Sequence, residues 1–352
     1  MSDFLGDNPS VEDYWRNIIL FGKNVASYKF ALAQSLLELA PRGKSIITLE
    51  ELAEPFARNL CEHLSLVPKQ TTSPSSKYLK NCQDFNAGII GREQLVEATV
   101  RLGFECVIDA FHNVNNVETP VRFFSGKRQG AKAIALTDEL FEMLESDRAL
   151  NLPVEVEARW RLVETAWELN ISRNLINVDY DADQELLFVQ RPRSRTNITS
   201  CRSALNGYQK GKCFYCFGDI SIVSGAVNLT DVDHFFPHVL IEDKIADPID
   251  GIWNLVLACV SCNRGVGGKF HLLPHQRYLE RLNTRNESLI DSHDPIAQTL
   301  MQQTGNSKPK RRSFLERNYN AAKTGRLINS NWQPAFEYPP APSFLMDGST
   351  DG

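Results

Sequence analysis

Two Cys-x-x-Cys pairs limit the fold of this chain more than any other feature of its sequence. The first pair is Cys213 and Cys216, the second is Cys259 and Cys262, and 42 residues separate them. Zinc takes four ligands in a tetrahedron, and each pair can supply two thiolates from one tight turn. A thioredoxin-like redox motif needs only one such pair near a β-α-β unit, which the pattern does not show. The sequence therefore predicts a structural zinc site with four cysteine ligands.

The 352-residue chain has the composition of a globular protein, with 42% hydrophobic and 23% charged residues, and its length predicts two domains. It contains no apolar run of about 18 residues, and its first ten residues, MSDFLGDNPS, lack the basic and apolar regions of a secretory signal. We therefore expect a cytoplasmic protein without a membrane span. The four remaining cysteines are expected to be small buried residues: Cys61, Cys82, Cys106 and Cys201.

The charge of the chain is distributed unevenly. Residues 1–190 hold 19 basic and 28 acidic residues, residues 191–330 hold 19 basic and 12 acidic residues, and residues 331–352 add three acids. The net charge of −5 speaks against a nucleic-acid binder, but the basic excess after residue 190 favours phosphate binding in that part. The excess is mild, and an ordinary solvated surface would explain it equally well.

The pattern of apolar residues predicts an α+β fold with a mostly helical N-terminal domain over residues 1–190. Helical spacing runs from Val11 to Ala40 with Ser10 as N-cap, and Thr48 begins a Thr-x-x-Glu capping box. Arg191 to Arg195, RPRSR, is a basic connector broken by proline, so residues 191–330 form the second domain and residues 331–352 a flexible tail. We expect a strand from Glu185 to Gln190 and a helix from Thr196 to Tyr208.

The residues that can carry chemistry lie between and around the cysteine pairs. The string DVDHFFPH contains adjacent Asp233 and His234, and Asn254 and Asn263 frame the second pair. A carboxylate is a hard ligand for a divalent cation, and an imidazole can take a proton near neutral pH. Hydrolysis of a phosphodiester needs both functions, because water must lose a proton while charge grows on the phosphate.

Over about residues 200–285 the chain resembles the HNH endonucleases, and DVDHFFP followed by CNRG is similar to the HNH domain of RNA-guided CRISPR nucleases. The resemblance implies a small ββα-metal domain in which His234 is the general base. Asp233 and Asn263 would bind the catalytic metal, and Asn254 would hold the loop and orient the histidine. Asn263 replaces the family's third histidine, which favours Mg²⁺ or Mn²⁺ as the catalytic ion. The glycine pair common soon after the proline is absent.

The resemblance also implies a substrate and partners. We expect cleavage of DNA, with RNA as an alternative substrate, in bacterial defence against foreign DNA as a restriction-like or CRISPR-associated effector. The acidity of residues 1–190 disfavours direct contact with DNA, so we expect this half to be a helical regulatory, targeting or protein-docking domain, with a protein or a ribonucleoprotein as its partner. Basic candidates for binding the nucleic-acid backbone are Arg191, Arg193, Arg195, Arg264, Lys269 and the run Lys308 to Arg312.

A second hypothesis uses the same residues without catalysis. In it, zinc stabilises a module that binds nucleic acid or a partner, and His234 is a hydrogen-bonding core histidine. His238 is expected to pack or to support the site rather than to bind metal. His271 and His275 are expected on the surface. His63, His112 and His293 have no partner in the sequence, so no functional role is expected for them.

Overall fold

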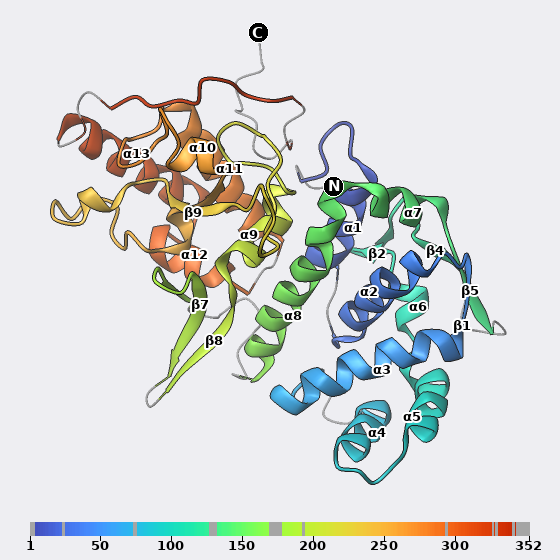
Figure 1. Ribbon diagram of the computed structural model, residues 1–352. Helices are drawn as coiled ribbons and strands as arrows, with labels where there is room; N and C mark the ends of the chain where they lie inside the picture. The colour runs from blue at the N-terminus through green and yellow to red at the C-terminus, as the bar shows by residue number, and fades with distance from the viewer. Residues whose placement is uncertain are drawn as a thin grey trace. The chain divides into compact units, whose positions relative to one another are not determined.

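The chain divides into two compact units. A computed structural model describes residues 4–22, 25–72, 76–126, 132–168, 178–191, 194–292, 295–325, 327, 330–339 and 342 (Figure 1). The N-unit is Pro9–Ile171, and the C-unit combines Met1–Asn8 with Ser172–Gly352. The division falls earlier than the predicted boundary at residue 190. The reason is an antiparallel sheet that runs from residue 179 to residue 200, across the expected connector.

The N-unit is mostly helical, as predicted. Helix α2 packs against both α3 and α8, so it lies at the centre of the unit. The helices of this unit are α1 (Val11–Phe21), α2 (Tyr28–Leu39), α3 (Leu49–Leu66), α4 (Lys77–Asn86), α5 (Arg92–Ala98), α6 (Val107–Ala110), α7 (Asp138–Glu145) and α8 (Leu152–Glu168). Shorter helical turns are η1 (Ala40–Arg42), η2 (Thr99–Gly103) and η3 (Asp147–Asn151).

Two helices of the N-unit begin at the predicted caps. The side chain of Ser10 accepts a hydrogen bond from the backbone of Asp13, whose carboxylate accepts one from the backbone of Ser10. Thr48 and Glu51 form the same reciprocal pair at the start of α3. Each capping box satisfies two backbone N–H groups that have no partner within the helix, and it therefore fixes where the helix starts.

Small antiparallel sheets complete the N-unit. Strand β5 (Ala133–Leu136) lies between β1 (Ile46–Thr48) and β4 (Phe124–Ser125). A two-residue turn, Asn115 and Asn116, joins β2 (Asn113–Val114) to β3 (Val117–Glu118). Both asparagines have positive φ angles, 52° and 66°, which is the conformation that a tight hairpin turn requires.

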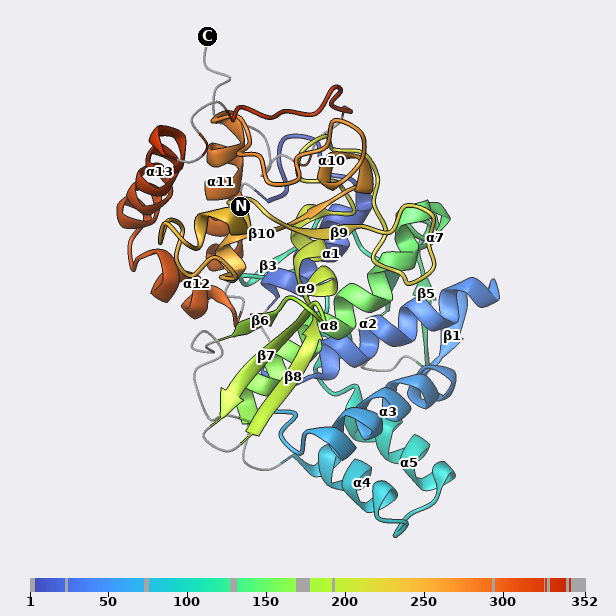
Figure 2. The ribbon, with the colours of Figure 1, turned by 60° about the vertical axis from the view of Figure 1, so that its left-hand side comes forward.

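The C-unit contains a second antiparallel sheet, with β7 (Leu186–Arg191) between β6 (Asp179–Asp181) and β8 (Ser194–Ser200) (Figure 2). The strand expected at residues 185–190 is therefore present. The helix expected from Thr196 begins only at Cys201, because residues 194–200 pair with β7. The helices of this unit are α9 (Cys201–Gln209), α10 (Val260–Asn263), α11 (Arg277–Asp291), α12 (Ala297–Thr304) and α13 (Lys308–Thr324).

A hairpin at the centre of the C-unit carries most of the predicted site. Strand β9 (Asp231–His234) pairs antiparallel with β10 (Leu255–Ala258), and α10 follows β10 directly. All four residues of β10 are fully buried, so this strand forms the floor of the hairpin. Two short turns, η4 (His238–Leu240) and η5 (Ile252–Asn254), lie in the loop that joins the strands. The overall fold is α+β, as predicted.

Part of the predicted flexible tail is bound to the C-unit. The backbone of Trp332 exchanges hydrogen bonds with Leu273 and His275, and its indole donates to Gly267 O over 2.7 Å. Tyr338 N donates to Cys216 O over 2.7 Å. The structure thus places residues 330–339 against the cysteine-bearing loops, because their backbone groups find partners there. Residues 340–341 and 343–352 lie outside the described residues.

Candidate metal centre and active site

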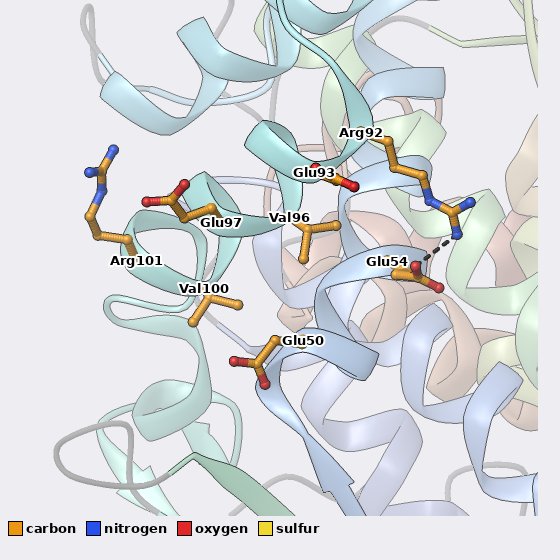
Figure 3. A pocket seen from close by; sticks show the side chains of 8 residues that line it. All are labelled: Glu50, Glu54, Arg92, Glu93, Val96, Glu97, Val100 and Arg101. Atoms are coloured by element: carbon orange, nitrogen blue, oxygen red, sulfur yellow. Dashed lines mark hydrogen bonds and ion pairs between the residues drawn. The ribbon is translucent and has the colours of Figure 1, made fainter.

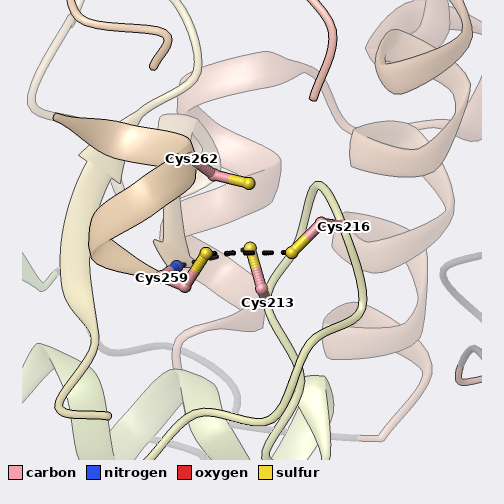
Figure 4. A group of neighbouring side chains, drawn as sticks. All are labelled: Cys213, Cys216, Cys259 and Cys262. Carbon is pink, nitrogen blue, oxygen red and sulfur yellow. Dashed lines mark hydrogen bonds between the residues drawn. The ribbon is translucent and has the colours of Figure 1, made fainter. Parts of the chain in front are cut away.

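The four cysteines predicted to bind zinc lie together (Figure 4). Their Sγ atoms are all within 4.8 Å of one another, and the Sγ atoms of Cys216 and Cys259 are 3.7 Å apart. Tetrahedral zinc with Zn–S bonds of about 2.3 Å would hold its sulfur ligands about 3.8 Å apart. The cluster can therefore hold a metal such as zinc, and four thiolates would leave no position for water on it.

The backbone around the cluster is arranged for sulfur ligands. Gly218 N lies 3.4 Å from Cys216 Sγ, and Cys259 N lies 3.3 Å from Cys213 Sγ, so each N–H points at a sulfur. Phe214 N donates to Leu257 O over 2.9 Å, which joins the first cysteine turn to β10. The metal centre is thus fixed to the same hairpin that carries His234.

Asp233, expected to bind the catalytic metal, is buried and already paired. Its Oδ1 accepts a hydrogen bond from Lys269 Nζ over 3.0 Å, and its Oδ2 accepts one from Tyr215 Oη over 2.7 Å. Lys269 Nζ also donates to His234 O over 2.7 Å, and its side chain is completely buried. Lys269 is therefore a structural cation inside the fold, and this placement does not suit the contact with nucleic acid expected of it.

Asn263, the other expected metal ligand, lies beside a different carboxylate. Its Nδ2 donates to Asp231 Oδ2 over 3.1 Å, and Arg264 Nε donates to the same oxygen over 2.8 Å. Both carboxylate oxygens of Asp233 accept hydrogen bonds, and Asn263 is bonded to Asp231, so each expected ligand has partners of its own. To hold a catalytic Mg²⁺ together, both residues would have to give up these bonds. Nothing in the residue pattern singles out Asp231 as the partner of Asn263.

Asn254 joins two segments of the loop between β9 and β10. Its Oδ1 accepts a hydrogen bond from Phe236 N over 2.8 Å, and its Nδ2 donates to Phe236 O over 3.0 Å and to Ile249 O over 2.8 Å. The side chain is fully buried, so these bonds do not compete with water. This geometry suits the loop-holding role that the resemblance implies for Asn254.

His234 lies at the end of β9 and meets two groups that were not expected to join it. Its Nε2 is 2.9 Å from Asp250 Oδ1 and 3.2 Å from His238 Nε2. His238 Nε2 is in turn 3.1 Å from Asp250 Oδ1. Successive residues of a strand point to opposite faces, which explains why His234 and Asp233 have different partners. The ring of Tyr180, from β6, lies 6.1 Å from the His234 ring between centroids.

The charges in this group influence one another. The hydrogen bond with His234 lowers the pKa of Asp250 below its usual value, against the opposing effect of partial burial. Partial burial and the neighbouring His234 lower the pKa of His238. Asp250 is one of four acids between residues 242 and 250, and no sequence signal distinguishes it from the others. Only the folded loop shows that it faces the histidines.

The basic residues proposed for nucleic acid have mixed surroundings. Arg264 is exposed, although it pairs with Asp231. Arg191 is in β7 and Arg195 is in β8, but their side chains are outside the described part of the structure. Arg193 lies outside the described residues altogether. The basic residues of α13 form ion pairs. Lys308 pairs with Asp291, and Arg311 pairs with Glu287. Arg312 pairs with both Glu280 and Glu316.

The remaining histidines have contacts that the sequence could not reveal. His63 lies between Glu157 and Glu164 and stacks on Trp160, and the Nε2 of His112 accepts a hydrogen bond from Phe123 N. His271 is exposed, as expected, and His275 is partly buried. His293 lies outside the described residues.

A groove in the N-unit is lined mainly by acidic residues (Figure 3). It has a volume of about 620 Å³ and lies between α3 and the α5 and η2 segment. Four of its lining residues are acidic, two are basic and two are apolar: Glu50, Glu54, Glu93, Glu97, Arg92, Arg101, Val96 and Val100. Arg92 forms an ion pair with Glu54 over 2.7 Å. The excess of carboxylates repels phosphate, so this groove does not suit a nucleic-acid backbone.

Comparison with known proteins returns no relative: no family model, no curated protein and no solved structure matches this chain. Among the described residues, no helix combines the length and the hydropathy that crossing a bilayer requires.

Proposed function

We propose that this protein is a metal-dependent endonuclease of the HNH type that hydrolyses phosphodiester bonds in DNA. The observation that carries the proposal is the position of His234 at the end of β9, where its imidazole meets Asp250 and His238 beside open solvent. Further support comes from the order of the elements, in which β9, β10 and α10 follow one another and the four-cysteine cluster holds them.

In the proposed reaction, the attacking water is activated beside the imidazole of His234. The water oxygen forms a bond to phosphorus, and the bond from phosphorus to the 3′ oxygen breaks. The water gives up a proton, either to the imidazole or to solvent, and the 3′ oxygen takes up a proton as it leaves. The products carry a 5′ phosphate and a 3′ hydroxyl. An imidazole can serve this step as a base or as a ligand of a cation.

The proposed substrate meets the C-unit rather than the N-unit. Arg264 is an exposed cation near the hairpin, and binding through such contacts would weaken steeply with added salt. The acidic groove of the N-unit favours a basic partner instead, in keeping with a docking role for that half. We extend the proposal to defence against foreign DNA, alone or within a CRISPR-type assembly. A guide RNA or partner subunit co-purifying from the native host would support the assembly.

A nicking assay on supercoiled DNA tests the proposed activity. The full-length protein should convert supercoiled plasmid to the open circle with Mn²⁺ or Mg²⁺ present. His234→Ala should reduce the rate by about 100-fold or more, because the water would lose its activating group. His271→Ala changes an exposed histidine that is not part of the group formed by His234, His238 and Asp250, and it serves as the matched control.

The zinc content of each variant should be measured, to show that the C-unit is intact. Equal cutting by the wild type and by His234→Ala would contradict the proposed site. A zinc-loaded protein that binds DNA or RNA and cuts neither with either cation would favour the second hypothesis, a binding module without catalysis.

A further inference from the structure

Three side chains of the C-unit direct a metal-binding atom at the same point. These atoms are Nε2 of His234, Nε2 of His238 and Oδ1 of Asp250. The distances between them are 2.9, 3.1 and 3.2 Å. Imidazole nitrogen and carboxylate oxygen together form a common ligand set for divalent transition metals. The three residues come from β9, from η4 and from the loop before η5.

The spacing of the three atoms is close to that of ligands around one ion. An octahedral ion with bonds of about 2.1 Å holds neighbouring ligand atoms about 3.0 Å apart, and a tetrahedral ion holds them about 3.3 Å apart. The three distances in this triangle are within a few tenths of an ångström of both spacings, so the side chains need to move only slightly.

Hydrogen bonds alone do not satisfy this triangle. Each Nε2 carries at most one proton, and the carboxylate oxygen can only accept. Two protons at most therefore serve three contacts, and when both protons point to Asp250 Oδ1 the two N–H groups lie 3.2 Å apart without an acceptor between them. A cation at the centre would give each of the three atoms a favourable contact.

The surroundings leave the outer side of the triangle open. The side chains of His238 and Asp250 are 48% and 46% exposed, whereas that of His234 is 13% exposed. A bound ion would therefore have positions for water and for a phosphate oxygen, as catalytic metal sites do.

Asn254 fixes the two sides of the triangle relative to each other. Its amide group bonds to Phe236, which lies between the two histidines, and to Ile249, which precedes Asp250. These bonds set the separation of the ligand-bearing segments before any ion binds, and such support raises the affinity of a metal site.

We propose that His234, His238 and Asp250 form a binding site for one divalent transition cation, with Mn²⁺ as a suitable ion. The use of this ion in DNA cleavage rests on the proposed function, whereas its binding does not. The proposal moves the catalytic metal away from Asp233 and Asn263. It also changes the role of His234 from general base to metal ligand: a bound ion would lower the pKa of its water, which would release its proton to solvent.

Titration of the full-length, zinc-loaded protein with Mn²⁺ tests the site, with free Mn²⁺ followed by its EPR signal. We expect one Mn²⁺ per chain, and pulsed EPR should show two imidazole nitrogens bound to it. His238→Ala and Asp250→Asn should each weaken Mn²⁺ binding on the order of tenfold or more. His271→Ala and Asp183→Asn change exposed residues elsewhere in the C-unit and should bind as the wild type does.

Several results would overturn the site: no binding to the wild type, unchanged binding in either His238→Ala or Asp250→Asn, or loss of binding in Asp233→Asn alone. Zinc content and thermal stability identify variants that have unfolded. The plasmid assay separates this inference from the proposed function. A protein that binds Mn²⁺ as described without cutting DNA would refute only the function, and one that cuts DNA while His238→Ala binds normally would refute only the site.

Discussion

Single residues in the N-unit show how surroundings decide what a histidine can do. His112 is almost fully buried, and its Nε2 accepts a hydrogen bond from Phe123 N over 3.0 Å. Burial lowers the pKa of His112 to about 3, and the nearby positive charges of Arg122 and Lys29 add to the effect. Protonation would place a second N–H against that of Phe123, so the ring stays neutral.

This environment predicts a loss of stability in acid. The unfolded chain binds a proton at His112 below about pH 6.5, whereas the folded chain resists it until about pH 3. The contribution of the neutral ring is therefore complete above pH 6.5 and declines as the pH falls, by about 3 kcal/mol at pH 4. His112→Gln keeps a hydrogen-bond acceptor without a titrating ring. Urea unfolding at pH 7 and pH 4 should show a smaller decline for this variant, and an equal decline would contradict the assignment.

The pKa of His63, in the same unit, is shifted in the opposite direction. Burial lowers its pKa, but hydrogen bonds with Glu157 and Glu164 outweigh this effect and leave the pKa raised. Its contribution is present below the unfolded pKa and is lost as the pH rises through the folded value. Neither environment could be predicted from the sequence, since both depend on residues at least ten positions away. The four cysteines could be predicted, because their spacing alone defines the ligand set.

At the scale of elements, a buried ion pair connects β9 to the loop after α10. Lys269 and Asp233 are both inside the fold, and the lysine also donates to the backbone of His234. The pair thus holds the end of β9, where the proposed site begins. Its stabilising effect depends on both partners, because either charge alone would be buried without compensation.

Removal of one partner should therefore cost more than removal of both. Lys269→Met should lower the free energy of unfolding by about 3 to 5 kcal/mol, because it leaves the carboxylate of Asp233 unpaired in the interior. The double variant Lys269→Met with Asp233→Leu should recover much of this loss. Denaturant unfolding of the wild type, both single variants and the double variant measures the coupling. Additive effects of the two substitutions would show that the pair does not act as one unit.

The elements themselves differed in how well the sequence predicted them. Helix starts at Ser10 and Thr48 were predicted correctly, because a capping box uses residues three positions apart. The predicted start of the next helix, at Thr196, was wrong, because residues 194–200 form β8 and pair with β7. Short strands such as β1 and β5 were missed because residues 46–48 and 133–135 meet only in the folded chain. Strand formation depends on such distant partners, whereas caps are local.

At the scale of the molecule, two units share one chain but differ in what stabilises them. The four-cysteine cluster lies wholly in the C-unit, and the helical core of the N-unit contains none of its ligands. The basic, proline-broken run at residues 191–195 predicted the boundary, but the division falls earlier because β7 and β8 pair with each other across this run. Each unit is defined by the contacts among its residues and not by its amino-acid composition.

Removal of zinc should therefore destabilise one unit and spare the other. A strong chelator at neutral pH should lower or abolish the thermal transition of the C-unit, because metal binding and folding are coupled at such sites. The transition of the N-unit should remain within about 2 °C of its original temperature. Differential scanning calorimetry before and after chelation measures both transitions. Cys259→Ser should reproduce the effect. Cys106→Ser should not, because this cysteine, which was expected to be buried, is exposed and lies outside the cluster. A common shift of both transitions would contradict independent units.

The membership of residues 1–8 in the C-unit has a consequence for the order of folding. Lys210 Nζ donates to Phe4 O over 2.6 Å and lies over the ring of Phe4, so a contact of the C-unit spans more than two hundred residues of chain. The N-unit is one continuous stretch of chain, Pro9–Ile171, with its own set of internal contacts. Closing so long a loop costs conformational entropy, and that cost falls when the intervening chain is already compact. The N-unit is thus placed to fold first and to shorten the loop whose closure completes the C-unit.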